Sequence, residues 1–564
     1  MFVIEHTAAD FHSKLASVAA SRLDDRTLTW INPVEIFTHS VGLAWKGPRN
    51  VSATSPKGVT CMTSRQSALR PLPSLRRGAF ALIALVGLVI VAFDAEAVPA
   101  FNRQTGQNCI ACHAGGQFPE LTPYGRMFKL TGYTIGERVL PLSVMGVASF
   151  ASVRDTTKTD DKTVDFQKNG TPLFATGSLF IAGKISENVG AFAQITYDNY
   201  AAQSVGADGV SLGKFQGHSH ADNMDFRYAD RLIDGNKDLI FGVSLNNNPS
   251  ISDPWNSAAA WMQYVPNASP TSHRFVDGTA PYPAFGSGGN IAGVNLYAYW
   301  NRKVYAELGT YQTAKRAFSF MTAGIDNASR TKLKEGSNPY WRFALTHDWG
   351  PHNLMVGTSG MVAHIFDGGT DISDPNNVSR VKNVGFDTQY QYLLDPHTIT
   401  FQAAYMRTTQ NYSANARAGA SPYFASDGVT PVAAFNPSDK MNVFRAKMSY
   451  VYNAKYGGSL SFFNRAGTTN TLNQTSGFDS NGQITSTDPQ ATGITSARVG
   501  GNLSGNPATR GSTYETFWMP VQYVRVGAQY TNYNKFNGTA TNYDGFGRNA
   551  KDNNTVFFYV WAAY

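Results

Sequence analysis

Segments of about ten residues in which apolar and polar side chains alternate recur through most of this 564-residue chain. Clear examples are 241–246, 304–309, 399–406 and 524–530. Successive side chains of a strand point to opposite faces, so this alternation predicts sheets with one apolar and one polar face. After Phe93 no apolar run approaches the about 20 residues that a membrane helix needs. Any membrane span beyond that point must therefore be a β-strand.

The connections between these segments alternate between short turns and long polar loops. The short turns are expected near 186–190, 234–238, 301–303, 348–352, 394–397, 453–457 and 519–520. The long loops are expected near 154–172, 199–221, 247–290, 313–337, 367–380, 410–438, 466–510 and 533–553. Seven turns and eight loops predict an all-β transmembrane antiparallel β-barrel of about 16 strands over residues 141–564. An even strand number places both ends of the barrel on the short-turn side, which is the periplasmic side of bacterial outer-membrane barrels.

The C-terminal segment independently favours a membrane barrel. Val556, Phe558, Val560, Ala562 and Tyr564 alternate with their neighbours down to an aromatic last residue. Such an ending is typical of barrels that the outer-membrane insertion machinery recognises. A soluble β-sandwich would also alternate, but it explains neither the unequal loops nor this ending.

Residues 109–113 read Cys-Ile-Ala-Cys-His. At this spacing two cysteines form thioethers to haem c, and the histidine ligates its iron. The alternative is a chance match or a redox Cys-x-x-Cys pair. We therefore predict one covalent haem c, bound by Cys109, Cys112 and His113, in a haem-binding segment over 98–140.

An apparent export signal precedes this motif, as haem c attachment outside the cytoplasm requires. Arg76 and Arg77 form a basic region, 79–93 is apolar, and 95–97 reads Ala-Glu-Ala, an A-x-A cleavage site. We interpret 62–97 as the signal peptide and 1–61 as a mis-called, disordered start. Two cysteines then remain, both used by haem, which leaves no thiol for catalysis.

The haem-binding segment has only about forty residues, too few to bury a porphyrin alone. A barrel of about sixteen strands has a lumen wide enough for a plug. We therefore expect the segment to plug the lumen from the periplasmic side, with the haem buried there. The chain carries 47 basic and 39 acidic residues, and neither this balance nor any motif indicates nucleic acid.

The second axial ligand has several candidates. Met127 is the first candidate because it follows His113 after a short loop, with Met145 and Lys129 as rivals. Barrel histidines are further candidates, namely His347, His352, His364 and His397. Arg126 is the candidate partner for the haem propionates, which need cations when buried. We predict no catalytic residue.

The chain resembles the fused monohaem cytochrome-porin proteins of the bacterial outer membrane, a family that includes ferrous-iron-oxidising cytochromes. The similar segments are the haem motif and 101–106, 119–133, 247–249, 253–256 and 542–549. The resemblance implies electron transfer between an extracellular donor such as Fe(II) and a periplasmic cytochrome c or other soluble carrier. If the protein is an enzyme, the resemblance implies a ferrous iron:cytochrome c oxidoreductase.

Two further functions stay open at this point. The first is a diffusive porin whose haem plug is structural or gating, which needs a continuous water path. The second is a haem-based ligand sensor, which needs an open sixth position at the iron. For all three functions we expect the barrel to contact outer-membrane lipid, with both termini periplasmic.

Overall fold

The computed structural model describes residues 100–154, 172–205, 211–256, 264, 291–322, 332–336, 338–367, 372–419, 423–424, 431–432, 436–470, 502–545 and 547–564. The expected signal peptide and the segment before it lie outside the described residues. Everything below concerns the described part of the chain.

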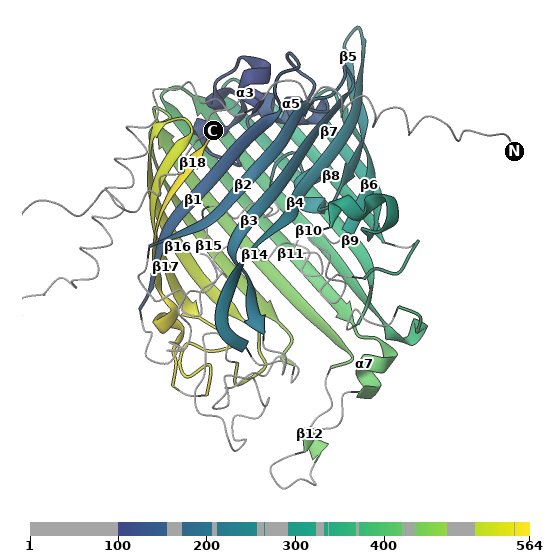
Figure 1. Cartoon of the computed structure of the whole chain (residues 1–564), viewed down its shortest axis with the longest axis vertical. Helices are drawn as coiled ribbons and strands as arrows, with labels where there is room; N and C mark the ends of the chain where they lie inside the picture. Colours follow the sequence, from purple (N-terminus) through teal and green to yellow (C-terminus); the bar gives the residue numbers. More distant parts are fainter. Residues whose placement is uncertain are drawn as a thin grey trace, which may run out of the picture. The chain divides into compact units, whose positions relative to one another are not determined.

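Sixteen antiparallel strands form one closed barrel (Figure 1), and this confirms the predicted strand number. They are β1 (Leu142–Val153), β2 (Leu173–Lys184), β3 (Val189–Val205), β4 (Ser211–Asp234), β5 (Lys237–Asn246), β6 (Ile291–Trp300), β7 (Val304–Thr313), β8 (Pro339–Trp349), β9 (His352–Phe366), β10 (Val378–Leu394), β11 (His397–Asn411), β14 (Ser438–Tyr452), β15 (Tyr456–Gly467), β16 (Thr509–Val521), β17 (Val524–Lys535) and β18 (Thr555–Ala563). Each strand pairs with its sequence neighbours, and β1 pairs with β18 to close the barrel. A separate two-stranded sheet, β12 (Tyr423–Phe424) with β13 (Pro431–Val432), lies in the connection between β11 and β14.

Six of the seven expected short turns connect consecutive strands where the sequence placed them, at one end of the barrel. The seventh is displaced: residues 519–520 lie inside β16, and the turn to β17 follows at 522–523. One expected long loop is wrong: β3 continues to Val205 and β4 already begins at Ser211, inside the segment 199–221. The ladder there includes the pairs Ala202 with Gln216 and Val205 with Ser211. Ladder hydrogen bonds are made by the backbone, so a polar composition that looked like a loop does not prevent pairing.

The outward face of the strands is apolar and the inward face is polar. Leu296 on β6 and Phe386 on β10 are 63% and 60% exposed, whereas Asn295 and Asn383 on the same strands are fully buried. Exposed aromatic residues near the short turns include Trp300, Trp349, Tyr452 and Trp518. A soluble protein has the opposite arrangement, and an apolar band with aromatic residues at its edge is the surface that lipid requires.

A helical segment precedes β1 and lies at the short-turn end of the barrel (Figure 1). It contains α3 (Ala100–Thr105), α4 (Cys109–Cys112), the 3-10 turn η1 (Ala114–Gly116) and α5 (Pro123–Leu130). We call residues 100–140 the N-terminal segment. None of the helices in the described ranges is long and apolar enough to cross a membrane.

The outward face gives a direct test of the membrane span. Leu296→Arg places a charge on the exposed face in the middle of β6, and we expect it to destabilise the barrel in lipid by about 2–4 kcal/mol. Ile372→Arg is the matched control, because Ile372 is also exposed but precedes η4 (Pro375–Asn377) in a loop. Urea unfolding in lipid vesicles measures both, and equal stabilities would contradict a lipid-facing β6.

Candidate cofactor site

The Cys-x-x-Cys-His motif is one short helical turn tied to the barrel. Cys109 and Cys112 are free thiols at the two ends of α4. The backbone N–H of Cys109 donates to the Oε1 of Gln522, 2.9 Å away, in the short turn between β16 and β17. The N–H of His113 donates to the carbonyl of Cys109 at 2.8 Å and closes the turn. The two thiols and the imidazole are thus held close together by local backbone geometry.

A tight loop after the motif turns the chain back alongside it. The N–H of Ala114 donates to the carbonyl of Glu120, and the N–H of Thr122 donates to the carbonyl of Cys112, both at 2.9 Å. Gly115 and Gly116 have φ values of 62° and 75°, which favour glycine because a Cβ is strained in this region. The loop therefore holds His113 in an extended conformation next to Leu121, with which it forms an isolated bridge.

Helix α5 packs directly on the backbone of the motif. Its N-cap is Thr122, whose side chain accepts from the N–H of Gly125, and Pro123 occupies the first turn. A Cβ on Gly125 would lie 2.2 Å from the carbonyl oxygen of Cys112. Only glycine at this position allows α5 to approach the motif so closely.

Buried polar contacts attach α5 to the inner face of the barrel. Arg126 donates to the carbonyl of Leu121 at 2.7 Å, to Gln389 at 3.0 Å and to Gln391 at 3.2 Å, and also to Asn353. Burial lowers the pKa of Arg126 to about 10, which leaves the guanidinium charged at neutral pH. The amides of the barrel therefore bind Arg126, the side chain that we expected from the sequence to bind the haem propionates.

Two further polar contacts extend this attachment. Lys129 donates to the carbonyls of Ile251 and Asp253, the second at 3.0 Å. Tyr133 donates to Asp225 on β4 at 2.6 Å, and Asp225 in turn pairs with Arg227 at 2.7 Å. The N-terminal segment is thus held by the strands and by the connection that follows β5.

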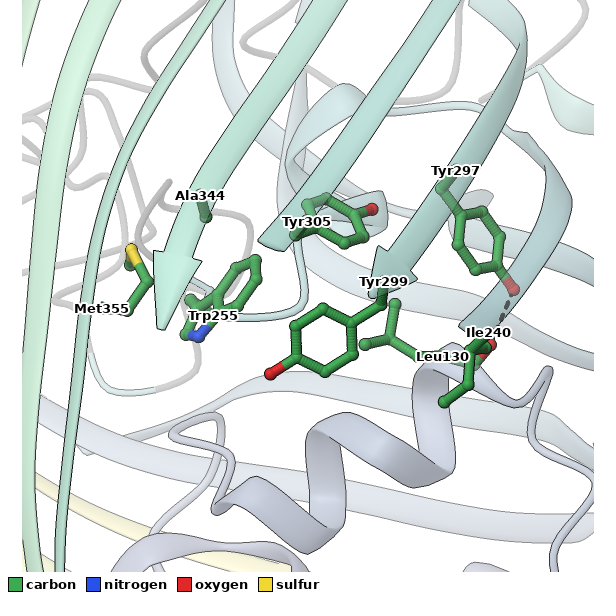
Figure 2. Close-up of a cluster of buried hydrophobic side chains, with 8 residues drawn as sticks. All are labelled: Leu130, Ile240, Trp255, Tyr297, Tyr299, Tyr305, Ala344 and Met355. Carbon is green, nitrogen blue, oxygen red and sulfur yellow. Dashed lines mark hydrogen bonds between the residues drawn. The ribbon is translucent and has the colours of Figure 1, made fainter. Parts of the chain in front are cut away.

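An aromatic cluster covers the end of α5 (Figure 2). Leu130 packs with Trp255, from the connection after α6 (Pro249–Ser252), and with inward tyrosines of β6 and β7. The hydroxyl of Tyr297 donates to the carbonyl of Leu130 at 2.8 Å. Met127 packs against this same cluster.

An apolar cavity of about 190 Å³ lies between the N-terminal segment and the barrel wall. His113 and Phe118 line it from the segment, Met145 from β1 and Trp561 from β18. The rings of His113 and Phe118 lie 4.0 Å apart between centroids, and those of Phe118 and Trp561 lie 5.1 Å apart. The motif histidine thus opens onto a mainly apolar, partly open space with aromatic residues in its lining.

His113 is chemically ready to bind a metal from this position. Burial lowers its pKa to about 4, so the imidazole is neutral near pH 7 and keeps a lone pair on one nitrogen. Within the described part of the chain its buried Nδ1 has no hydrogen-bond partner, which is uncommon for a buried polar atom. Two free thiols, one neutral imidazole and an apolar cavity fit the requirements of haem c.

Not every residue expected at this site reaches the cavity. Arg126 and Met127 do not line it, and neither do the four barrel histidines, His347, His352, His364 and His397. Lys129 and Met145, the rivals of Met127, both line it. Sequence reasoning missed Phe118 and Trp561. The sequence did contain a signal for Trp561, because Phe557, Tyr559 and Trp561 are aromatic residues at alternate positions and share the inward face of β18.

Comparisons with known proteins add little to this description. No protein family model matches the sequence, and no curated protein is similar to it. Among solved structures, OmpT of Vibrio cholerae is 9% identical, covers 75% of this chain and 96% of its own, and has a TM-score of 0.35. OmpF of Salmonella typhi, in a complex with daunomycin, is 10% identical with coverages of 75% and 97% and a TM-score of 0.37. An anion-selective porin of Comamonas acidovorans is 10% identical with coverages of 75% and 99% and a TM-score of 0.34. Likenesses of this size say nothing about the site.

The contact between Gly125 and Cys112 can be tested by substitution. We expect Gly125→Ala to push α5 away from the motif, because the added Cβ meets a backbone carbonyl at 2.2 Å. Overpacking of this kind costs about 1–3 kcal/mol, so cleavage of the N-terminal segment by trypsin should become roughly tenfold faster. Gly146→Ala on β1 is the control, since its Cβ would meet only a phenylalanine ring at 3.4 Å. Equal cleavage rates would show that the close approach is unimportant.

Proposed function

We propose that this protein is an outer-membrane c-type cytochrome-porin that carries electrons from an extracellular donor to a soluble periplasmic carrier. The observation that carries the proposal is the place of His113. A Cys-x-x-Cys-His motif presents its imidazole, neutral and with Nδ1 unpartnered among the described residues, to an apolar cavity lined in part by the barrel wall. The resemblance to cytochrome-porin proteins points in the same direction.

In this proposal Cys109 and Cys112 form the two thioethers, and His113 is the proximal ligand. When bound, haem c supplies a one-electron couple between ferric and ferrous iron. The chain supplies the surroundings: Phe118 and Trp561 exclude water, and apolar burial of this kind tunes the potential. Lys129 lines the cavity, whereas the guanidinium of Arg126 is taken up by the barrel. The Lys129 ammonium already donates to two backbone carbonyls, so we assign neither cation as the partner of a haem propionate.

The two ends of the barrel support a partner on each side of the membrane. In outer-membrane barrels the short turns face the periplasm and the long loops face the outside. The N-terminal segment lies at the short-turn end (Figure 1), so its haem would be close to a periplasmic cytochrome c or other soluble carrier. With Fe(II) as donor, a haem held by Cys109, Cys112 and His113 would supply the one-electron couple that connects the donor to this carrier. The activity would be that of a ferrous iron:cytochrome c oxidoreductase.

The diffusive porin is less well supported by the contacts in the lumen. Inward side chains pair with one another or with the N-terminal segment, as in Arg342 with Asp387, Arg525 with Glu515 at 2.8 Å, and Lys447 with Glu120 at 2.9 Å. Burial alone would raise the pKa of Glu120, but Lys447, Arg525 and a backbone hydrogen bond together hold that pKa below its ordinary value. Inward side chains that pair along the wall or with the N-terminal segment leave fewer groups to hydrate passing solutes.

The donor can be tested by stopped-flow absorbance. The purified oxidised protein in detergent is mixed with ferrous iron, and the haem α-band is followed. We expect rapid reduction in the unchanged chain and in Ile110→Ala, which alters an exposed residue between the two cysteines. Cys112→Ser should lose both covalent haem and the reaction. Haem that dithionite reduces but Fe(II) does not would keep the cytochrome and exclude ferrous iron as donor.

Single-channel conductance distinguishes the proposed electron-transfer function from that of a diffusive porin. In a planar lipid bilayer we expect conductance steps well below those of an open sixteen-stranded porin. The reason is that the N-terminal segment and the connection after β5 contact each other inside the barrel, where ions would pass. The hydrogen bond from Asn256 to the carbonyl of Pro119, at 2.7 Å, is one such contact. Steps as large as those of an open porin would favour the diffusive function.

A further inference from the structure

The barrel wall brings a sulfur atom to the cavity that His113 faces. Met145 lies on β1, where Leu142 and Val144 are 40% and 46% exposed on the outward face. Side chains alternate along a strand, so Met145 is on the inward face with Val147. It lines the same cavity as His113, which approaches from the N-terminal segment. One cavity therefore has an imidazole from one element and a thioether from another.

The packing around Met145 holds it next to the aromatic residues of the site. Met145 belongs to an apolar cluster with Trp561 and Phe118, and the Phe118 ring lies 4.0 Å from that of His113 between centroids. The backbone of β1 is fixed on both sides, with Met145 paired to Ala563 of β18 and to Ser178 of β2. Methionine has three rotatable bonds, so its sulfur can adjust while the strand stays in place.

The competing ligands are engaged elsewhere. Met127 packs against the cluster of Trp255 and Leu130 and does not line the cavity. The Lys129 ammonium already donates to two backbone carbonyls. Among the described residues that line the cavity, Met145 is the sulfur donor and His113 the imidazole.

We propose that Met145, a residue of the barrel wall, is the second axial ligand of the haem iron. This inference rests on the proposed function, because it needs haem bound at His113. Histidine with methionine is a known axial pair of c-type haems, and the thioether raises the reduction potential. The haem then links the N-terminal segment to the first strand of the barrel. A filled sixth position also argues against a ligand sensor.

The test compares the same substitution at two methionines. Met145→Leu and Met127→Leu both replace a thioether by an apolar side chain of similar volume, which cores usually tolerate. We expect Met145→Leu to lose the near-infrared sulfur-to-iron band of the ferric haem. Its ferrous form should bind carbon monoxide stoichiometrically, whereas the unchanged chain and Met127→Leu should bind little. The reduction potential should fall in Met145→Leu alone.

A second variant distinguishes the loss of an iron ligand from misfolding. Met145→His should keep covalent haem and give a low-spin spectrum with two imidazole ligands and a lower potential, since the replacement ligand sits on the same strand. The gel mobility of unheated and heated samples is compared to check that the barrel of each variant is closed. An unchanged near-infrared band in Met145→Leu, or its loss in Met127→Leu instead, would overturn the assignment. Absence of covalent haem from the unchanged chain would overturn the proposed function itself, and haem staining detects this separately.

Discussion

Polar side chains that are buried inside the barrel need hydrogen-bond partners from the protein, because burial removes them from water. This constraint governs the interior of the barrel. Inward residues such as Asp225, Arg227 and Gln389 are fully buried, yet each has a partner. Several of those partners come from the N-terminal segment: Tyr133 binds Asp225, and Arg126 binds Gln389. The wall and the segment thus complete each other's hydrogen bonds.

The same constraint explains how so short a segment can hold a defined site. Residues 100–140 form only short helices, and their own core is a small aromatic cluster of Phe101, Phe128 and Tyr133. Their other buried contacts are with the barrel: Gln522 holds the start of the motif, the cluster of Trp255 covers Leu130, and Val451 faces Gly115. A motif that would be mobile in a free peptide is therefore held against a cavity.

Local patterns predicted the parts of this structure that depend on local physics. The strands follow from alternation with period two, and the short turns from their Gly, Asn, Asp and Pro content. The grouping of Cys109, Cys112 and His113 follows from one helical turn. The surroundings of the site do not follow in this way, because they join residues hundreds of positions apart. The environment of Arg126 depends on Gln389 and Gln391, and no local signal indicates that these amides face α5.

In β18, the strand that closes the barrel, the residues of both faces are apolar. Along β18, Val556, Phe558 and Val560 formed the visible apolar alternation, while the residues between them, Phe557, Tyr559 and Trp561, are aromatic and buried. Both sets look apolar, so the pattern alone does not separate the lipid face from the cavity face. The ladder does: Trp561 pairs with Val147 of β1, two positions from Met145 and on the same face. Because β1 and β18 lie at opposite ends of the barrel sequence, this wall of the cavity exists only after those strands have paired. Closure of the barrel and completion of the cavity are therefore one structural event.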